Sequence, residues 1–458
     1  MFPTTLTRRT ALKSASSGFG YLAFAGLSTW AAEKSAGPLA PKQSHFPMKA
    51  KRVIFLCMEG APSHVDTFDH KPKLTADDGK PFKGARFSGG KLLGSPWKFA
   101  QHGKSGLWIS DLYPELSKHA DDLCLVNSMQ TDVPAHPQAF VQMHTGMFQF
   151  KRPSMGAWVL YGLGSENENL PGFVTISPTP GNGGSVNYSS SFLPAICQGT
   201  PVGFGSRFGG QSGVSNIKNP QQTSSAQRIQ LDFIQSLNRE ALERDKVNPG
   251  VEGAIESFEL AFRMQKDIPK LMDLATESAA TKKLYGIDET ATDSFGKQCL
   301  LARRLVEAGV RFVELTSPGW DHHRDLKASL GRNCLATDKP MAGLLADLKS
   351  RDMLKDTLVI WGGEFGRTPY AQGDDGRDHN HKGFTTWFAG GGVKGGINYG
   401  KTDEYGYEAV ENKMHVHDWH ATVLHLLGLD HEKLTFRYAG REMRLTDVKG
   451  NVAKGILA

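Results

Sequence analysis

The sequence is poor in cysteine and has no cluster of cysteines. Its 458 residues contain five, at Cys57, Cys124, Cys197, Cys299 and Cys334, and no CxxC motif. This spacing excludes a zinc ribbon, a dithiol redox motif and a disulfide-stapled scaffold, although it leaves room for one disulfide. The stability of the fold must therefore come from its core.

No apolar run is long enough to cross a bilayer. The segment from Thr7 to Ala32 is interrupted by Ser and Gly, whereas a membrane-spanning helix needs about 20 predominantly apolar residues. Paired arginines followed by a weakly apolar stretch and small residues instead resemble a twin-arginine export signal. We expect this signal at 1–32, a linker at 33–50, and a periplasmic or secreted mature protein without a stable membrane span.

A strong excess of one charge is also missing. The formal charge of the whole chain is +6. Removal of the expected signal, which holds Arg8, Arg9 and Lys13 and no acid, lowers it to +3. Because no basic stripe interleaved with aromatic residues is present, nucleic acid is excluded as a partner. A hydrophobic content of 39% and a charged content of 22% describe an ordinary globular protein.

What the sequence does contain is a series of short apolar runs, several of them preceded by helical segments. Such runs predict buried strands at 52–58, 122–129, 309–317, 356–363 and 384–391. Strands that alternate with helices predict a mostly parallel sheet covered on both faces. A Gly/Ser-rich insertion is expected at about 180–230, and helices are expected within 222–290.

Polar side chains come after these strands, where the carboxyl ends of a parallel sheet gather ligands. In chain order they are Glu59, His64 and Asp66 after the first run, His136 beyond the second, Asp321 and His323 after the third, and Glu364 after the fourth. This placement predicts a functional site at one edge of the sheet.

Two of the polar motifs combine His with carboxylates. "GWDHHRD" contains Asp321 and His323, and "GRDHNH" contains Asp378, His379 and His381. An isolated His is more often a satisfied structural residue than a ligand. Here, however, the residues directly follow apolar strands and are flanked by Gly, which favours a site. His and carboxylate ligands without thiolates suit zinc, manganese or iron.

Arg367 lies between these motifs in "GGEFGRTP". It could pair with Asp374 or Asp378 in a structural role. It could equally clamp an oxyanion, because a planar guanidinium matches phosphate and sulfate.

At these residues the chain resembles a known family. The motifs "FLCMEGAPSHVDTFDHKPKL", "GWDHH", "VIWGGEFGRTP" and "GRDHNHKGFTTWFAGGGVKGG" resemble the exported bacterial proteins of domain-of-unknown-function family 1501. That family is usually placed in the alkaline phosphatase and sulfatase superfamily. The resemblance covers roughly 50 to 450. It implies an alkaline-phosphatase-like domain at 51–458, a three-layer α/β/α sandwich with a mostly parallel central sheet.

The resemblance also implies a metal site at the carboxyl ends of the strands. A divalent metal is expected, zinc first, with manganese or calcium as alternatives. Phe365 stands where the superfamily has a metal-binding His, and Glu59 stands where it has an Asp. The implied ligands are Asp321, His323, Glu364 and His379, with His381, His64 and Asp66 as secondary candidates.

The nucleophile is the largest departure from the superfamily. "HPQAFVQMHTG" keeps Thr145-Gly146, but His136 falls where sulfatases carry the Cys that becomes formylglycine. His136 could attack phosphorus, bind the metal or be inert. Thr145 and Ser128 are weaker nucleophile candidates.

We therefore expect an exported metal-dependent hydrolase of phosphate or sulfate esters of small molecules or glycans, with His136 and Arg367 as catalytic residues. The alternative is a binding or scaffold protein that keeps the fold without catalysis. A metal-dependent mutase or lyase is a third hypothesis, which covalent labelling of His136 or Thr145 would reveal.

Overall fold

A computed structural model of the protein describes residues 39–85, 90–203, 221–245 and 249–458. The expected export signal at 1–32 lies outside the described residues, and so does 204–220 of the expected insertion.

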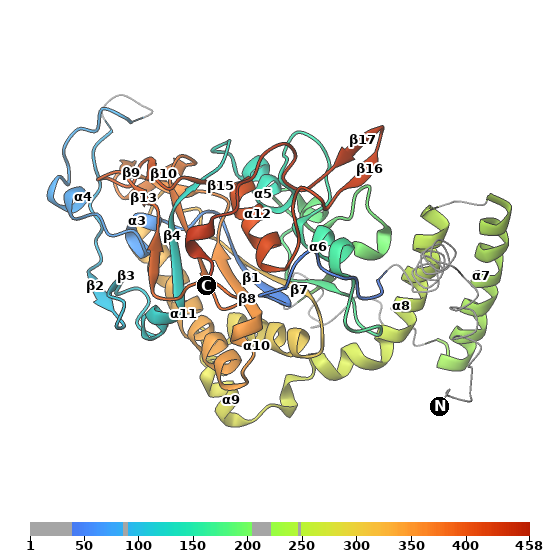
Figure 1. Cartoon of the computed structure of the whole chain (residues 1–458). Helices are drawn as coiled ribbons and strands as arrows, with labels where there is room; N and C mark the ends of the chain where they lie inside the picture. The colour runs from blue at the N-terminus through green and yellow to red at the C-terminus, as the bar shows by residue number, and fades with distance from the viewer. Residues whose placement is uncertain (1–38, 86–89, 204–220, 246–248) are drawn as a thin grey trace, which may run out of the picture.

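A nine-stranded sheet forms the centre of the molecule (Figure 1). Its order is β12-β4-β11-β8-β1-β7-β5-β6, and β15 also pairs with β4. Only β11 runs antiparallel to its neighbours, β4 and β8. The strands are β1 (Arg52–Glu59), β4 (Leu123–Gln130), β5 (Phe173–Ile176), β6 (Thr200–Val202), β7 (Phe312–Pro318), β8 (Thr357–Gly362), β11 (Phe384–Ala389), β12 (Ile397–Tyr399) and β15 (Met414–His415).

The five strands expected from the sequence are confirmed as β1, β4, β7, β8 and β11, and the fold is the predicted α/β class. In β1, every residue after Arg52 is buried. Because both faces of the strand are covered, it carries a continuous apolar run instead of an alternating one. The fifth strand, β11, runs antiparallel to its neighbours. The chain connects β8 to β11 through the β9–β10 hairpin (residues 366–380) and without a crossover helix, which a parallel connection would need.

Helices cover both faces of the sheet (Figure 1). On one side lie α10 and α11, and on the other α5, α6 and α12; Phe55 of β1 packs against His144 of α5 and Trp419 of α12. The helices are α3 (His64–Thr67), α4 (Pro72–Ala76), α5 (His136–Thr145), α6 (Met155–Leu163), α7 (Ser224–Asp245), α8 (Pro249–Met272), α9 (Ala279–Leu284), α10 (Asp293–Glu307), α11 (Leu326–Ser350) and α12 (Val416–Leu426).

Short hairpins and 3₁₀ turns complete the described structure. The hairpins pair β2 (Phe99–His102) with β3 (Leu107–Ser110), β9 (Gly366–Gln372) with β10 (Gly376–Asn380), β13 (Lys401–Thr402) with β14 (Ala409–Glu411), and β16 (Phe436–Tyr438) with β17 (Arg441–Met443). The 3₁₀ helices are η1 (Leu116–Asp122), η2 (Gly184–Tyr188), η3 (Ala195–Cys197), η5 (Leu274–Thr276), η6 (Leu354–Asp356) and η7 (Lys454–Ile456).

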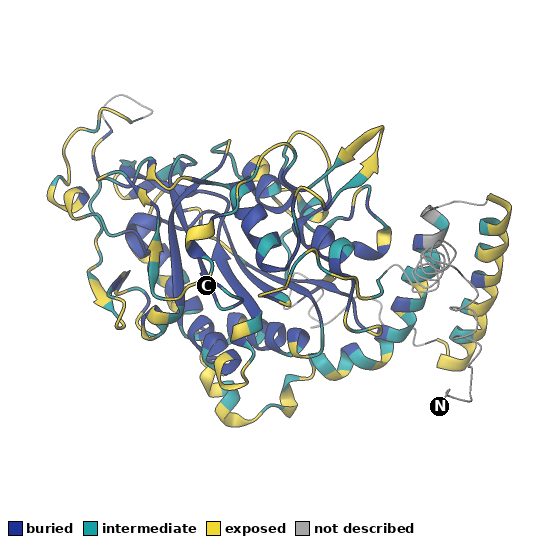
Figure 2. Cartoon of the chain, viewed as in Figure 1, coloured by how far each residue is buried: buried dark blue, intermediate teal, exposed yellow. Residues whose placement is uncertain are grey.

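The main core is a large apolar cluster built around the central sheet, whose inner strands β1, β8 and β11 are buried almost completely (Figure 2). All five cysteines are buried and free, so the stability of the described fold does not depend on a disulfide. None of the helices in the described part of the chain combines the length and the apolarity that a membrane span needs.

Candidate metal centre

Four side chains from three separate segments converge at the carboxyl edge of the sheet. They are His136, Asp321, His323 and His379, and one potential ligand atom of each lies within 4.8 Å of all the others. His136 is the first residue of α5, and His379 lies in β10. Asp321 and His323 lie in the loop between β7 and α11. The expected grouping of Asp321, His323 and His379 is therefore present.

Asp321 Oδ1 is the centre of this cluster. The Nε2 atoms of His323, His136 and His379 lie 2.9, 3.1 and 3.5 Å from it. The Nε2 atoms of His323 and His379 also face each other at 2.9 Å. The Asp321 side chain is 44% exposed, so solvent reaches the cluster.

The outer ring nitrogens fix the direction of the three imidazoles. His379 Nδ1 lies 2.7 Å from the Pro134 carbonyl oxygen, and His136 Nδ1 lies 2.5 Å from Glu364 Oε1. His323 Nδ1 bonds to the side-chain oxygen of Gln372. Because carbonyls and carboxylates only accept, each Nδ1 carries a proton, and in the neutral form of each ring Nε2 turns a lone pair toward Asp321. A His that binds a metal through one ring nitrogen typically donates from the other to a carboxylate or carbonyl in this way.

His136 Nε2 shows what the cluster requires. It is buried, lies out of line for a hydrogen bond to Asp321, and has no hydrogen-bond partner among the described residues. Three imidazole lone pairs and one carboxylate oxygen repel one another unless protons or a cation lie between them. Since buried polar atoms are nearly always paired, a cation fits this arrangement.

The charge balance supports the same conclusion. Burial alone would lower the pKa of His136, but the carboxylates of Asp321 and Glu364 outweigh it and raise that pKa to about 9. Burial would raise the pKa of Asp321, but His136, His379 and Arg367 hold it well below its usual range. Positive charge is therefore favoured at this position.

Two glycines allow the segments to approach. Gly60 has φ +109°, and a Cβ there would lie 2.7 Å from the Asp321 backbone nitrogen. At Gly376, a Cβ would lie 1.8 Å from the His323 carbonyl oxygen. A side chain at either position would push the Asp321–His323 loop away from the strand ends.

Glu364, expected as a ligand, lies directly behind the cluster. Its side chain is fully buried. Its Oε1 accepts from His136 Nδ1 at 2.5 Å and from the Gly60 backbone nitrogen at 3.1 Å. The structure thus uses this carboxylate to orient His136.

Arg367, expected as an anion clamp, is fully buried and surrounded by protein oxygens. Its Nη2 lies 2.6 Å from Asp321 Oδ1, and its Nε donates to the Ala61 carbonyl at 2.9 Å. The carbonyls of Gly60, Trp320 and Arg377 accept its other bonds. The clamp role is not supported, because the guanidinium is already used to hold Asp321 and the loop after β1. Of the two sequence hypotheses, the structural one is closer, with Asp321 as the partner in place of Asp374 or Asp378.

The three secondary ligand candidates lie outside the cluster. His64 is buried, with Nε2 2.7 Å from the Gly406 carbonyl oxygen. Asp66 forms two bonds with Arg377, at 2.7 and 3.0 Å. His381 lies just after the end of β10, so its side chain is not bound to point to the same side as that of His379. The charged groups that act on it are Lys382, Asp132 and Glu408.

The weaker nucleophile candidates are also structural. Thr145 Oγ1 donates to the carbonyls of Val141 and Met147, each at 2.7 Å. Ser128 Oγ donates to the Asn412 carbonyl at 2.7 Å. Both side chains are buried.

Sequence reasoning missed the groups that orient the imidazoles. Gln372 ends β9, and Pro134 contributes only its backbone carbonyl. A single amide side chain and a carbonyl leave no recognisable pattern in a sequence. Gln372 pairs with Gly376 at the turn end of the β9–β10 hairpin, and this register is set by the fold and not by a local sequence pattern.

A second group of possible ligands lies deeper in the core. Cys57, His144 and Glu314 are all buried. His144 Nε2 lies 3.1 Å from Glu314 Oε1 and 4.0 Å from Cys57 Sγ, and its Nδ1 donates to the Phe140 carbonyl at 2.7 Å. Burial and the nearby acids raise the pKa of the Cys57 thiol well above its usual value, so it is protonated.

A family model described as "Protein of unknown function (DUF1501)" matches residues 50–457. The chain belongs to this family, which confirms the resemblance inferred from its motifs. The curated proteins contain no match to the sequence.

Solved structures of sulfatases and phosphatases are similar to the chain at low identity. The PsFucS1 sulfatase from Pseudoalteromonas sp. is 14% identical over 84% of this chain and 68% of its own, with a TM-score of 0.37. A protein of the alkaline phosphatase superfamily from Vibrio parahaemolyticus is 11% identical over 86% and 70%, with a TM-score of 0.36. The alkaline phosphatase from the Antarctic bacterium TAB5 is 10% identical over 76% and 92%, with a TM-score of 0.31. None of these likenesses assigns a reaction to this chain.

Proposed function

We propose that this protein is a metal-dependent hydrolase of phosphate or sulfate esters, exported by a twin-arginine signal at 1–32. One observation carries the proposal: three Nε2 lone pairs and one carboxylate oxygen converge at a solvent-accessible point. The ligands would be His136, Asp321, His323 and His379. Glu364 then acts behind His136 and not as a ligand.

The donor set favours zinc among divalent metals. Imidazole suits zinc and other transition metals, whereas calcium takes oxygen ligands. A bound metal ion would polarise an ester oxygen and lower the pKa of a bound water.

The protein's own residues prepare this site. Glu364 holds the His136 ring, the Pro134 carbonyl and Gln372 hold His379 and His323, and Arg367 holds Asp321. None of the four converging side chains carries a hydroxyl or a thiol. In this arrangement His136 also has no free ring nitrogen for attack, since Glu364 holds Nδ1 and the metal would take Nε2. We therefore infer that water attacks the ester, with no covalent intermediate on the protein.

A catalytically inactive binding protein is the competing function. The absence of a nucleophile among the four ligands and the complete use of Arg367 by protein oxygens favour it. Hydrolysis of a simple ester separates the two functions.

The first test is elemental analysis of the purified protein and of two matched variants. His379→Ala removes a proposed ligand, whereas His381→Ala removes a His of the same motif that lies outside the cluster. We expect about one metal ion per chain in the wild type and in His381→Ala, and none in His379→Ala. The metal-loaded wild type should hydrolyse 4-nitrophenyl phosphate or sulfate, and chelation should abolish this activity.

Two results would contradict the proposal. A wild type that stays folded and metal-free after exposure to zinc and manganese would remove the metal site. A metal-loaded wild type that hydrolyses neither ester would leave the metal site and favour the binding protein.

A further inference from the structure

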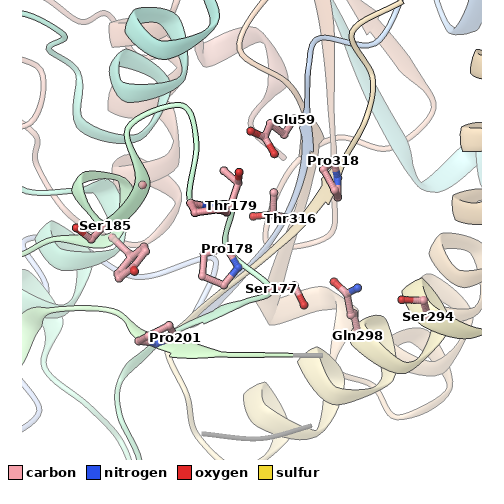
Figure 3. A pocket seen from close by; sticks show the side chains of 13 residues that line it. Glu59, Ser177, Pro178, Thr179, Ser185, Pro201, Ser294, Gln298, Thr316 and Pro318 are labelled. Atoms are coloured by element: carbon pink, nitrogen blue, oxygen red, sulfur yellow. The ribbon is translucent and has the colours of Figure 1, made fainter. Parts of the chain in front are cut away.

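A cavity of about 820 Å³ lies at the same edge of the sheet as the candidate metal centre, and Figure 3 shows its lining. It lies at the carboxyl ends of β1, β5 and β7, closed on one side by η2 and on another by the start of α10. Figure 3 shows Glu59 toward one end of the cavity, with Gln298 and Ser294 toward another. A cavity of this size accommodates a group as large as one or two sugar rings.

Glu59 joins this cavity to the metal centre. Its side chain lines the cavity, and its backbone carbonyl accepts from the Trp320 nitrogen at 3.1 Å, one residue before Asp321. The next residue, Gly60, donates its backbone N–H to Glu364. An ester bound at the metal centre would therefore extend its alcohol part past Glu59 into the cavity.

Two residues of the lining each carry a polar atom without a partner. Ser177 Oγ and Gln298 Oε1 are buried under their neighbours and have no hydrogen-bond partner among the described residues. Ser177 has φ +51°, an uncommon conformation for a non-glycine residue and one that often marks a functional site. Because buried polar atoms left unpaired are costly, these two atoms point to a ligand that carries hydroxyl groups.

The charge of the lining disfavours a ligand that carries an additional anionic group. Among the described lining residues Glu59 is the only carboxylate, and none is Lys, Arg or His. Glu59 accepts from Asn182 Nδ2 at 2.6 Å, which fixes its position. A second sulfate, phosphate or carboxylate on the ligand would meet this carboxylate and no cation. The rings of Tyr188 and four prolines supply apolar surface for the C–H faces of a sugar.

We propose that the cavity selects esters whose alcohol part is a neutral, hydroxyl-rich group, such as an uncharged sugar that carries a single sulfate or phosphate. Ser177 and Gln298 are the specificity residues that bond its hydroxyls, and Glu59 excludes a second anionic group. This inference rests on the proposed function, because it assigns the cavity to the alcohol part of the substrate.

The test compares three kinds of ester with the metal-loaded protein. The probes are methyl glucoside 6-sulfate and 6-phosphate, the same glucosides with a second sulfate at O2, and the 4-nitrophenyl esters. The variants are Gln298→Leu and Glu59→Gln, with Gln101→Leu on the exposed strand β2 as the matched control. Metal content is measured for each variant.

We expect the wild type to prefer the glucoside with one anionic group over the glucoside with two by at least about 10-fold in kcat/KM. Gln298→Leu should lower kcat/KM for the glucoside with one anionic group by about 10-fold, through KM, with little effect on the 4-nitrophenyl esters. Glu59→Gln should reduce the discrimination against the second sulfate. Gln101→Leu should behave as the wild type.

Ester hydrolysis and sugar binding separate an error in the assignment of the cavity from an error in the proposed function. If the wild type hydrolyses esters but prefers the glucoside with a second sulfate, or if Gln298→Leu affects all probes equally, the inference is overturned and the proposed function stands. If no ester is hydrolysed, binding of methyl glucoside is measured by NMR. Binding that is lost in Gln298→Leu retains the neutral-sugar cavity, and absence of binding overturns it.

Discussion

Helix α5 carries two histidines that each contact a carboxylate, and the two residues differ in whether the second ring nitrogen also has a partner. His144, near the end of the helix, pairs with Glu314 and the Phe140 carbonyl, so both of its ring nitrogens have partners. His136, at the start of the helix, pairs only through Nδ1, and its Nε2 has no hydrogen-bond partner among the described residues. The first arrangement leaves no ring nitrogen without a partner, whereas the second leaves one.

The two clusters also differ in access to solvent. The side chains of His144 and Glu314 are 3% and 4% exposed, and Cys57 beside them is protonated. Asp321, in contrast, is 44% exposed and is shared by three imidazoles and Arg367. The unpaired ring nitrogen and the access to solvent make the His136 cluster the stronger candidate for a metal site.

The largest expected effect comes from breaking the buried pair. Glu314→Ala leaves His144 without its carboxylate in the core, and removing one partner of a buried ion pair typically costs about 3–5 kcal/mol. We expect the free energy of unfolding, measured in urea, to fall by about this amount. The metal content of the folded fraction should not change, because Glu314 does not belong to the metal centre.

The matched change in the other cluster is His323→Ala. In chelator-treated protein it should alter the free energy of unfolding by less than about 1 kcal/mol, because the side chain is one-third exposed. It should nevertheless abolish metal binding. If both variants lost stability equally and both kept the metal, the contrast between the clusters would be wrong.

A smaller effect is expected behind the metal centre. Glu364→Gln keeps the shape of the side chain and removes the charge that His136 Nδ1 faces. Loss of such a partner typically weakens metal binding by 10–100-fold. The affinity can be measured by competition with a chromogenic chelator.

Glu408→Gln is the control for Glu364→Gln, because Glu408 is a partly exposed carboxylate paired with Lys382 outside the cluster. It should leave the affinity unchanged. An unchanged affinity in Glu364→Gln would mean that this carboxylate does not tune the centre, and would reopen its assignment as a direct ligand.

The sequence predicted the strands that carry this site better than the contacts within it. Continuous apolar runs indicate buried strands, and polar residues that follow β7 and β8 lie at one edge of a parallel sheet. Asp321, His323 and His379 were found in this way. His136 was found through the family resemblance, with its role left open.

The roles of Glu364 and Arg367 could not be predicted, because they depend on where a side chain points after its strand ends. Glu364 turns toward Gly60 and His136, and Arg367 turns into the carbonyls after β1. His379 and His381 are two apart in sequence, but β10 ends at Asn380, so only His379 keeps the orientation of the strand. Such directions are set by tertiary contacts that no local pattern encodes.

The smallest expected effect is the pH dependence of the stability that His144 contributes. Burial opposes the charged form of His144, but Glu314 and the Phe140 carbonyl outweigh it and raise the pKa of this residue. A raised pKa in the folded state stabilises the protein fully below the unfolded value of about 6.5 and loses this contribution as pH rises through the folded value. The difference in free energy of unfolding between the wild type and His144→Gln, measured in urea with metal bound, should therefore be larger at pH 6 than at pH 9. A difference that grows with pH would mean that His144 is neutral in the folded protein and that the buried cluster is not an ion pair.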